Sequence, residues 1–329
     1  MSATRSLHAE MALVATQAGS VPQRADALLA CLREVVPYTA AWIGVRDPET
    51  RVHRRVGSDG DTASLVRYFA HPYADDELEQ LGLNRYRHPV PASALPVPLP
   101  ETVAWGEYLL PAGFHDGVAM GLFADDGRHL GLLTVLTTDP AQRTASYVGL
   151  LAGLRPIIAV ALDRLPSFAE AAELTGDAIG GTVITRAGHG LPVPGLPTHP
   201  LLAEGSAALV VARRHACAPG SASAFLAVWA GTLLRVGVLD CRDETADHLC
   251  ALALVRPAGG AADLARSDVR LLGALVEGWD DDRIRAALGL SDPARSAEDL
   301  ARRLALRSTA ALVQHAAREG LYLPPALWD

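Results

Sequence analysis

Histidine and cysteine side chains occur close together at two places in the chain, and they are the residue types best suited to binding a soft metal ion. His215 and Cys217 are two residues apart, His248 and Cys250 are two apart, and Cys241 lies between the pairs. In a strand, such a pair points to one face, so His248 and Cys250 could share an ion. Their spacing matches no paired zinc signature, and a thiol within an apolar run, like Cys250, is typical of a protein core. We therefore predict no metal site.

Motifs for catalysis are missing as well. The sequence contains no GxxxxGK[ST] phosphate loop, no GxGxxG after a strand and no GxSxG nucleophile turn. Its carboxylates are dispersed rather than paired for acid–base work. We predict that the protein is not an enzyme and uses no cofactor.

The balance of positive and negative charge restricts the classes of partner that the protein can bind. All 29 basic residues of the 329-residue chain are arginines; they face 37 acidic residues, and the formal net charge is −8. Contact with a nucleic acid would therefore depend on a local cluster of arginines. The sequence shows no secretion signal, no apolar run approaching the roughly 18–20 residues of a membrane span, and too few cysteines for a disulfide framework. These features predict a reduced, cytoplasmic protein without membrane contact.

The first 165 residues predict one α+β domain. Residues 9–36 have the apolar spacing of one or two amphipathic helices, and the segments TAAWIGVRD and RVHRRVG predict two strands joined by a polar turn. Residues 63–109 are expected to be irregular because HPVPASALPVPLP is too rich in proline. The segment GVAMGLFADDGRHLGLLTVLTT predicts a hairpin that turns at Asp126-Gly127, and an apolar helix follows.

This order of helix, strands, long loop, hairpin and helix resembles a GAF sensor domain, most closely in WGEYLLPAGFHDGVAMGLFADDGRHLGLLTVL. The resemblance implies a small ligand held between the sheet and the long loop, or a scaffold for dimers. The candidate lining residues are aromatic: Trp42, Trp105, Tyr108, Phe114 and His115. The alternative is that these side chains simply form core, because pockets and cores use the same residue types.

Residues 166–260 predict a second domain. FAEAAELT and LLAEGSAALVVARRHA have helical patterns, AFLAVWAGTLLRVGVLDCRD predicts a hairpin about Ala230-Gly231, and HLCALALVRP predicts a third strand. The three strands resemble the second half of a PAS domain, although the preceding proline-rich stretch offers only one short strand. Residues 257–262, PAGGAA, are expected to form a flexible linker.

Residues 261–329 predict a helical domain. Four short helices are expected between Leu264 and Gly320, with Gly278 and Gly289 at C-terminal turns and Ser291 capping the third helix. The framework is similar to the LuxR-type helix-turn-helix of actinobacterial regulators that carry an N-terminal GAF-like domain. This resemblance implies a homodimer that binds DNA, with a dimer surface formed by Ala311, Leu312 and Ala316 of the last helix and the nearby Leu321.

The residues expected to contact DNA depart from the family pattern. The stretch that corresponds to the recognition helix is shortened and contains Glu298 and Asp299, and residues 264–321 hold nine arginines and nine acidic residues. The candidate contacts to DNA are Arg283, Arg285, Ser291, Arg295, Arg302 and Arg303. Alternatively, these arginines pair with nearby carboxylates on a solvated surface.

Two functions follow from these alternatives. The first is a cytoplasmic transcription regulator that senses a ligand or partner through its N-terminal modules and binds DNA through a divergent helix-turn-helix. The second is a sensor that has lost DNA binding and acts through heterodimers or other protein contacts.

Overall fold

The computed structural model describes residues 2–85, 87–142, 144–218, 222–242, 248–259 and 264–328, with side chains from residue 7 onward. The chain forms two compact units: the first extends to Asp163, and the second comprises Arg164–Arg242 and Leu249–Asp329. The expected linker lies partly outside the described residues, because 260–263 are not among them. The two units are described separately below.

The N-terminal unit is built on a five-stranded antiparallel sheet with the strand order β2-β1-β5-β4-β3. The predicted strand pair and the predicted hairpin are both present, and the hairpin turns at Asp126-Gly127. The strands are β1 (Ala40–Asp47), β2 (Val52–Asp59), β3 (Val90–Pro91), β4 (Asp116–Phe123) and β5 (His129–Thr137). The short β3 pairs only with β4, at one edge of the sheet.

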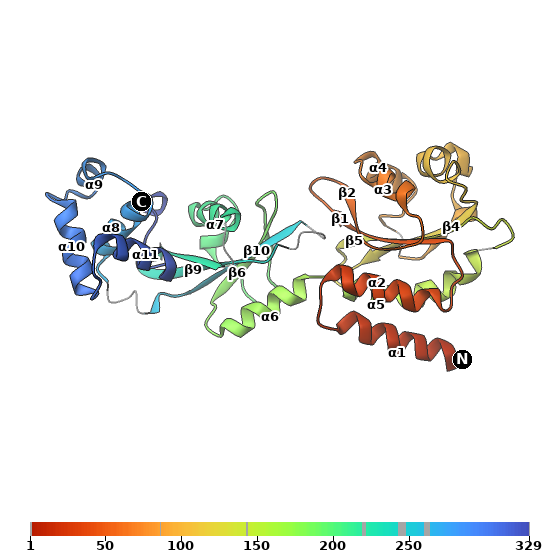
Figure 1. Cartoon of the computed structure of the whole chain (residues 1–329), viewed down its shortest axis with the longest axis horizontal. Helices are drawn as coiled ribbons and strands as arrows, with labels where there is room; N and C mark the ends of the chain where they lie inside the picture. Colours follow the sequence, from red (N-terminus) through yellow and green to blue (C-terminus); the bar gives the residue numbers. More distant parts are fainter. Residues whose placement is uncertain are drawn as a thin grey trace. The chain divides into compact units, whose positions relative to one another are not determined.

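Each face of this sheet is covered by helices (Figure 1). Alternation along β1 sends Ala41, Ile43 and Val45 to one face and Trp42 to the other. The first face packs against α1 (Ser2–Thr16), α2 (Val21–Arg33) and α5 (Val148–Leu162). The second face is covered by α3 (Ala63–Phe69), α4 (Tyr73–Gln80) and η3 (Ala104–Leu109). The helix–strand–hairpin–helix order on which the GAF resemblance rests is therefore confirmed.

The expectation that residues 63–109 are irregular is wrong for the first part of that segment, which forms α3 and α4, and for its end, which forms η3. α3 and α4 are only seven and eight residues long, so their apolar periodicity is too short to stand out. Their buried side chains, including Leu65, Phe69 and Leu78, face the sheet. The proline-rich part holds β3 and two single 3-10 turns, η1 (Ala92–Ala94) and η2 (Leu99–Glu101).

One helical stretch, Thr144–Leu162, is long and apolar enough to cross a membrane by these two criteria alone. It includes α5, whose buried residues Leu151, Leu154 and Ile158 belong to the core between helices and sheet. Core helices of soluble proteins meet the same criteria. One third (33%) of the residues in the apolar window are buried in the structure.

The C-terminal unit contains a second five-stranded antiparallel sheet, with the order β7-β6-β10-β9-β8. Counted along the chain, this is the strand order of the first sheet. The strands are β6 (Gly180–Thr185), β7 (Gly190–Pro192), β8 (Ala222–Trp229), β9 (Thr232–Asp240) and β10 (Leu249–Pro257). β6 and β7 supply the strands that the sequence barely indicates. The predicted hairpin turns at Ala230 and Gly231, both with positive φ (48° and 80°), as a tight two-residue hairpin requires.

Helices lie on both faces of this second sheet (Figure 1). α7 (Ala207–Cys217) packs on the face that carries Phe225, Val236 and Ala253. α6 (Leu165–Thr175) packs on the opposite face, against Leu252 and Leu254. The mixed α+β class is confirmed for both units.

Four helices end the chain, as predicted: α8 (Arg266–Val276), α9 (Asp281–Leu288), α10 (Pro293–Arg303) and α11 (Thr309–Glu319). Gly278 and Gly289 adopt left-handed conformations after α8 and α9, with φ of 70° and 69°. The expected cap of α10 is wrong by one residue. Asp292, not Ser291, accepts the backbone N–H of Arg295, and its carboxylate is the stronger acceptor at a helix N-terminus.

These helices share a hydrophobic core with the second sheet. The backbone N–H of Leu226 donates to the carbonyl of Tyr322 at 2.8 Å, and Val269 and Leu323 pack against the Leu226 side chain. Leu312 and Ala316 of α11 are 0% and 1% exposed within this core. Two of the residues expected at the dimer surface are therefore internal, and the second sheet and the four final helices belong to one compact unit, Arg164–Arg242 and Leu249–Asp329.

Candidate ligand-binding site

An apolar cavity of about 60 Å³ lies between the N-terminal sheet and the helices that cover its second face. Its floor comes from β4 and β5, through Ala119, Leu132 and Leu136. Its walls come from the covering segment, including Phe69, Leu78 and Trp105. The segment expected to be an unstructured loop thus supplies most of the enclosure.

The five aromatic candidates from the sequence are placed differently around this cavity. Trp105 lines it directly. Trp42, Phe114 and Tyr108 belong to the same apolar layer, where Trp42 stacks on Phe69 with ring centroids 4.5 Å apart. His115 is exposed and contributes its backbone N–H to the carbonyl of Thr137, so it does not belong to this layer.

Two polar groups on the floor of this layer have no hydrogen-bond partner among the described residues. Thr134 lines the cavity, and its Oγ1 is buried and unpartnered. Trp42 lies opposite Thr134 on the neighbouring strand, and its Nε1 is also buried and unpartnered. Leaving such groups unpaired costs free energy. A ligand with an oxygen that accepts a hydrogen bond would relieve that cost at Thr134.

Gly44 makes room for the indole of Trp42. A Cβ at this position would lie 1.9 Å from Cη2 of Trp42, which is far inside van der Waals contact. The ring of Trp42 therefore lies flat along β1, where Phe69 stacks on it. A side chain at position 44 would remove the aromatic floor beside the cavity.

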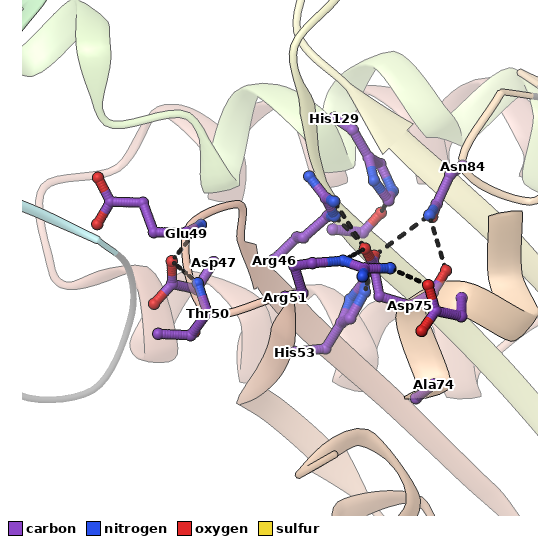
Figure 2. Close-up of polar contacts among 12 residues, drawn as sticks. Arg46, Asp47, Glu49, Thr50, Arg51, His53, Ala74, Asp75, Asn84 and His129 are labelled. Atoms are coloured by element: carbon purple, nitrogen blue, oxygen red, sulfur yellow. Dashed lines mark hydrogen bonds and ion pairs between the residues drawn. The ribbon is translucent and has the colours of Figure 1, made fainter. Parts of the chain in front are cut away.

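The cover is tied to the sheet through Asp75 of α4 (Figure 2). Arg46 of β1 binds both carboxylate oxygens at 2.7 Å, and Arg51 donates at 3.2 Å. His53 of β2 lies 3.4 Å from Oδ1, and Asn84 donates at 3.2 Å. Burial alone would raise the pKa of Asp75, but the hydrogen bonds from Arg46 and His53 lower it well below the usual range. Asp75 is thus a permanent carboxylate at neutral pH.

Two buried histidines complete this end of the layer. Burial lowers the pKa of His53 despite the opposing effect of Asp75. Burial also lowers the pKa of His129 to about 3, and its Nε2 lies 2.8 Å from the carbonyl of Gly131, where it must donate. Both rings are therefore neutral at pH 7.

A second carboxylate on α4 ties the helix to the rest of the cover. Glu77 accepts the backbone N–H groups of Val103 at 2.5 Å and Ala104 at 2.9 Å, and the hydroxyl of Tyr68 at 2.5 Å. These contacts fix the start of η3, which carries Trp105 into the cavity wall. Asp75 thus holds α4 on the sheet, and Glu77 holds η3 on α4.

The sequence did not single out Thr134, Phe69 or the Asp75 cluster. Thr134 stands within the apolar hairpin, where threonine is a common strand residue. Asp75 sits in the acidic segment YADDELEQ, which is typical of an exposed helix. The available signal was Arg46 at the end of the apolar strand segment AAWIGVRD, because a cation close to the core requires an anion nearby.

The six residues expected to contact DNA lie on or beside α9 and α10. Three of the arginines bind carboxylates: Arg285 pairs with Asp282 at 2.5 Å, Arg302 with Asp299, and Arg303 with Asp268 at 2.6 Å. Arg283 lies over the ring of Trp279, 3.8 Å from its centroid.

The remaining two residues expected to contact DNA, Arg295 and Ser291, are both exposed. Arg295 forms no ion pair with any residue that the structure describes, and Ser291 lies in the turn before α10. Arg295, Glu298, Asp299 and Arg302 follow at helical spacing, so they share the exposed face of α10. That face carries two positive and two negative charges.

Two of the side chains considered for metal binding have other contacts. The ring of His215 lies 3.2 Å from the hydroxyl of Tyr322, and the thiol of Cys250 donates to the carbonyl of Ile184. Within the described parts of the chain, no three His, Cys, Asp or Glu side chains are grouped as metal ligands.

No protein-family model matches the chain, and no curated protein sequence matches it. Solved structures show a partial likeness. One is the chromophore-binding domain of an unusual bacteriophytochrome from R. palustris, with 14% identity and a TM-score of 0.39 over 51% of this chain and 61% of that one. The chain therefore spans less than two thirds of that structure.

Two further structures are described as GAF domains. One is the phycoerythrobilin-bound GAF domain from a cyanobacterial phytochrome, with 16% identity and a TM-score of 0.39 over 48% of this chain and 92% of that one. The other is the GAF domain from a phosphoenolpyruvate-protein phosphotransferase of Coxiella burnetii, with 16% identity and a TM-score of 0.37 over 51% and 96%. Likenesses this distant carry no conclusion about function.

Proposed function

We propose that the N-terminal unit is a sensory module that binds a small, mostly apolar molecule in the cavity above β4 and β5. The observation that supports this most is the unpartnered hydroxyl of Thr134 in an otherwise apolar enclosure. Such a site selects a ligand with an apolar body and one oxygen that accepts a hydrogen bond. A bilin, as named for one structural neighbour, is far too large for a cavity of about 60 Å³.

The size of the cavity links binding to movement of the cover. An engineered core cavity that takes up benzene measures about 150 Å³, so a ligand of that size would displace the cover here. Asp75 keeps α4 on the sheet, so the outward movement would fall on η3 and would break its hydrogen bonds to Glu77. Ligand binding would in this way change the outer surface of the unit.

The test is a panel of small ketones, esters and aromatic aldehydes, measured by thermal unfolding of the full chain. At least one compound should raise the Tm saturably in the wild type. Ala119→Leu, which fills the cavity from its floor, should abolish that rise, whereas Ala112→Leu at an exposed position should preserve it. A panel without any saturable rise in the wild type would contradict the proposal.

For the C-terminal unit we propose an output through protein contacts in the cytoplasm, the second of the functions drawn from the sequence. The supporting observation is the balanced charge of the α10 face, because affinity for DNA depends on phosphate neutralisation. A partner protein with its own mixed charges can pair with Arg295, Glu298, Asp299 and Arg302, whereas a duplex is repelled by the two carboxylates.

DNA binding by a homodimer is the competing proposal. It is favoured by the order of α8 to α11 and by the exposure of α10, which a recognition helix requires. Fluorescence anisotropy with a duplex from the upstream region of the gene, at 50 and 200 mM salt, separates the two. Binding that weakens with salt and is lost in Arg295→Ala/Arg302→Ala would establish DNA binding; no binding by the wild type would leave protein contacts as the output.

A further inference from the structure

A second pocket, of about 230 Å³, lies on the face of the C-terminal sheet that α6 covers. α6 packs on Leu252 and Leu254 at one end of this face. At the opposite end, Leu323 from the C-terminal segment packs on Leu226. The pocket between these covers is lined by three arginines from three elements: Arg235 of β9, Arg256 of β10 and Arg318 of α11. We call it the arginine pocket.

Arg235 and Arg256 are direct cross-strand partners, so two like charges lie side by side on one face of the sheet. Such pairs destabilise a sheet unless an anion compensates them. Gly237 is the next residue of β9 on this face, and a Cβ there would lie only 3.1 Å from Nη2 of Arg256. The missing side chain lets the guanidinium of Arg256 extend across β9 toward the pocket.

The protein itself neutralises this charge only in part. Arg235 donates to the backbone carbonyl of Glu319 at 2.5 Å, and Arg256 lies 3.7 Å from the half-exposed carboxylate of Asp177. Among the described residues Arg318 forms no ion pair, and Glu319 is the one carboxylate in the lining. The Nε atoms of Arg235 and Arg256 are buried without a hydrogen-bond partner in the same set.

We propose that the arginine pocket binds a phosphate group, either as the free ion or on a small metabolite. Three guanidinium groups that approach from two strands and a helix suit the several oxygens of a tetrahedral dianion better than one planar carboxylate. The bound dianion compensates the Arg235–Arg256 repulsion and bridges the sheet to the end of α11. This site is separate from the apolar cavity and does not depend on the ligand proposed there.

The test uses inorganic phosphate as the probe and the full chain, at constant ionic strength set with sodium chloride. Calorimetric titration should show one saturable site, and the Tm should rise with phosphate. Arg256→Gln should weaken binding at least tenfold. Arg214→Gln, at an exposed position of α7 outside the pocket, should bind like the wild type.

Phosphate also stabilises proteins non-specifically, so the variants decide the result. Equal stabilisation of the wild type and Arg256→Gln would overturn the proposal. In phosphate-free buffer Arg256→Gln should melt no lower than the wild type, because it removes a like-charge pair. If it fails to fold, the exposed Arg318→Gln replaces it, with severalfold weaker binding expected and unchanged binding overturning the proposal.

The class of anion is tested with glycerol 2-phosphate and malonate. Glycerol 2-phosphate binding more tightly than inorganic phosphate would indicate a phosphorylated metabolite, and the reverse order would indicate the free ion. Malonate binding as tightly as either would refute the assignment to phosphate.

Discussion

Thr134 carries an unpaired hydroxyl beside the apolar cavity, and this makes it the sharpest test of the site at the level of one residue. Valine has nearly the same shape without the polar group. Thr134→Val should therefore raise the free energy of unfolding of the unliganded protein by about 1 kcal/mol. The same variant should weaken any ligand found in the panel. Urea unfolding and ligand titration measure the two effects, and a destabilised variant would show that the hydroxyl has a partner.

His129 and His53 should make stability depend on pH. In the unfolded chain both have a pKa of about 6.5, whereas in the folded protein the pKa of His129 is about 3 and that of His53 is lowered. Below about pH 6.5 the unfolded chain takes up protons that the folded one does not, so stability falls as pH falls. His129 then contributes a loss of about 1.4 kcal/mol per pH unit, and His53 acts in the same direction.

His129→Gln keeps a donor for the carbonyl of Gly131 but cannot titrate. We expect its loss of stability between pH 7 and pH 5 to be smaller than that of the wild type by about 2 kcal/mol. His71→Gln, at an exposed position, is the control and should behave like the wild type. Parallel pH profiles for all three proteins, measured by urea unfolding, would mean that His129 titrates normally.

Sequence reasoning succeeds at this scale where residue type decides burial. Trp42, Trp105 and Phe114 were expected either to line a pocket or to form core, and all three are buried in the apolar layer. It fails where the burial of a side chain depends on the residues that surround it in space. His115 comes directly after Phe114 but is exposed, and Asp75 is buried where Arg46, Arg51 and His53 of the β1–β2 strand pair and its turn bind it, more than twenty residues away along the chain.

At the scale of elements, α4 joins the sheet to the rest of the cover through two carboxylates, Asp75 and Glu77, which are two residues apart. Glu77→Ala removes the acceptor for two backbone N–H groups and should destabilise the start of η3 by about 2 kcal/mol or more. Amide hydrogen exchange should become faster in residues 103–110 but not in β4 or β5. Glu79→Ala, an exposed residue of the same helix, should leave the exchange of η3 unchanged. Faster exchange throughout the unit would mean that Glu77 supports the whole core instead.

Elements with a strong local signal were predicted and are confirmed. The hairpins at Asp126-Gly127 and Ala230-Gly231 each have a glycine that adopts the positive φ of the turn, and the helices of the tail have clear stop signals at Gly278 and Gly289. α3 and α4 were missed because two helical turns give too few apolar positions to show a period. β7 was missed because only three residues pair.

At the scale of the molecule, the C-terminal unit should fold only as a whole. Removing residues 259–329 would expose Leu226, Phe225 and Val236, and it would leave the N–H of Leu226 without its acceptor. We expect a chain of residues 1–258 to keep the unfolding transition of the N-terminal unit and to lose that of the second sheet. Urea unfolding followed by circular dichroism tests this. Two cooperative transitions in the shortened chain would show that the second sheet is stable alone.

Sequence periodicity finds helices and strands but not the partners they pack against. The tail has all the marks of a separate domain, including the glycine-rich stretch before it. Its apolar faces are nevertheless completed by Phe225, Leu226 and Val236 of the sheet, more than thirty residues away along the chain. The charge of α10 was legible from its composition, whereas the pairing of Arg303 with Asp268 of α8 required the fold.

The indole of Trp42 occupies the space above Gly44. This contact predicts which substitutions the protein tolerates at position 44. Any other amino acid at position 44 would collide with the ring, so a saturation library selected for folded protein should retain only glycine there. Gly149, with nothing within 4 Å of an added Cβ, should by contrast accept alanine readily within its helix. Gly44 and Gly149 should thus differ sharply in the number of amino acids that can replace them.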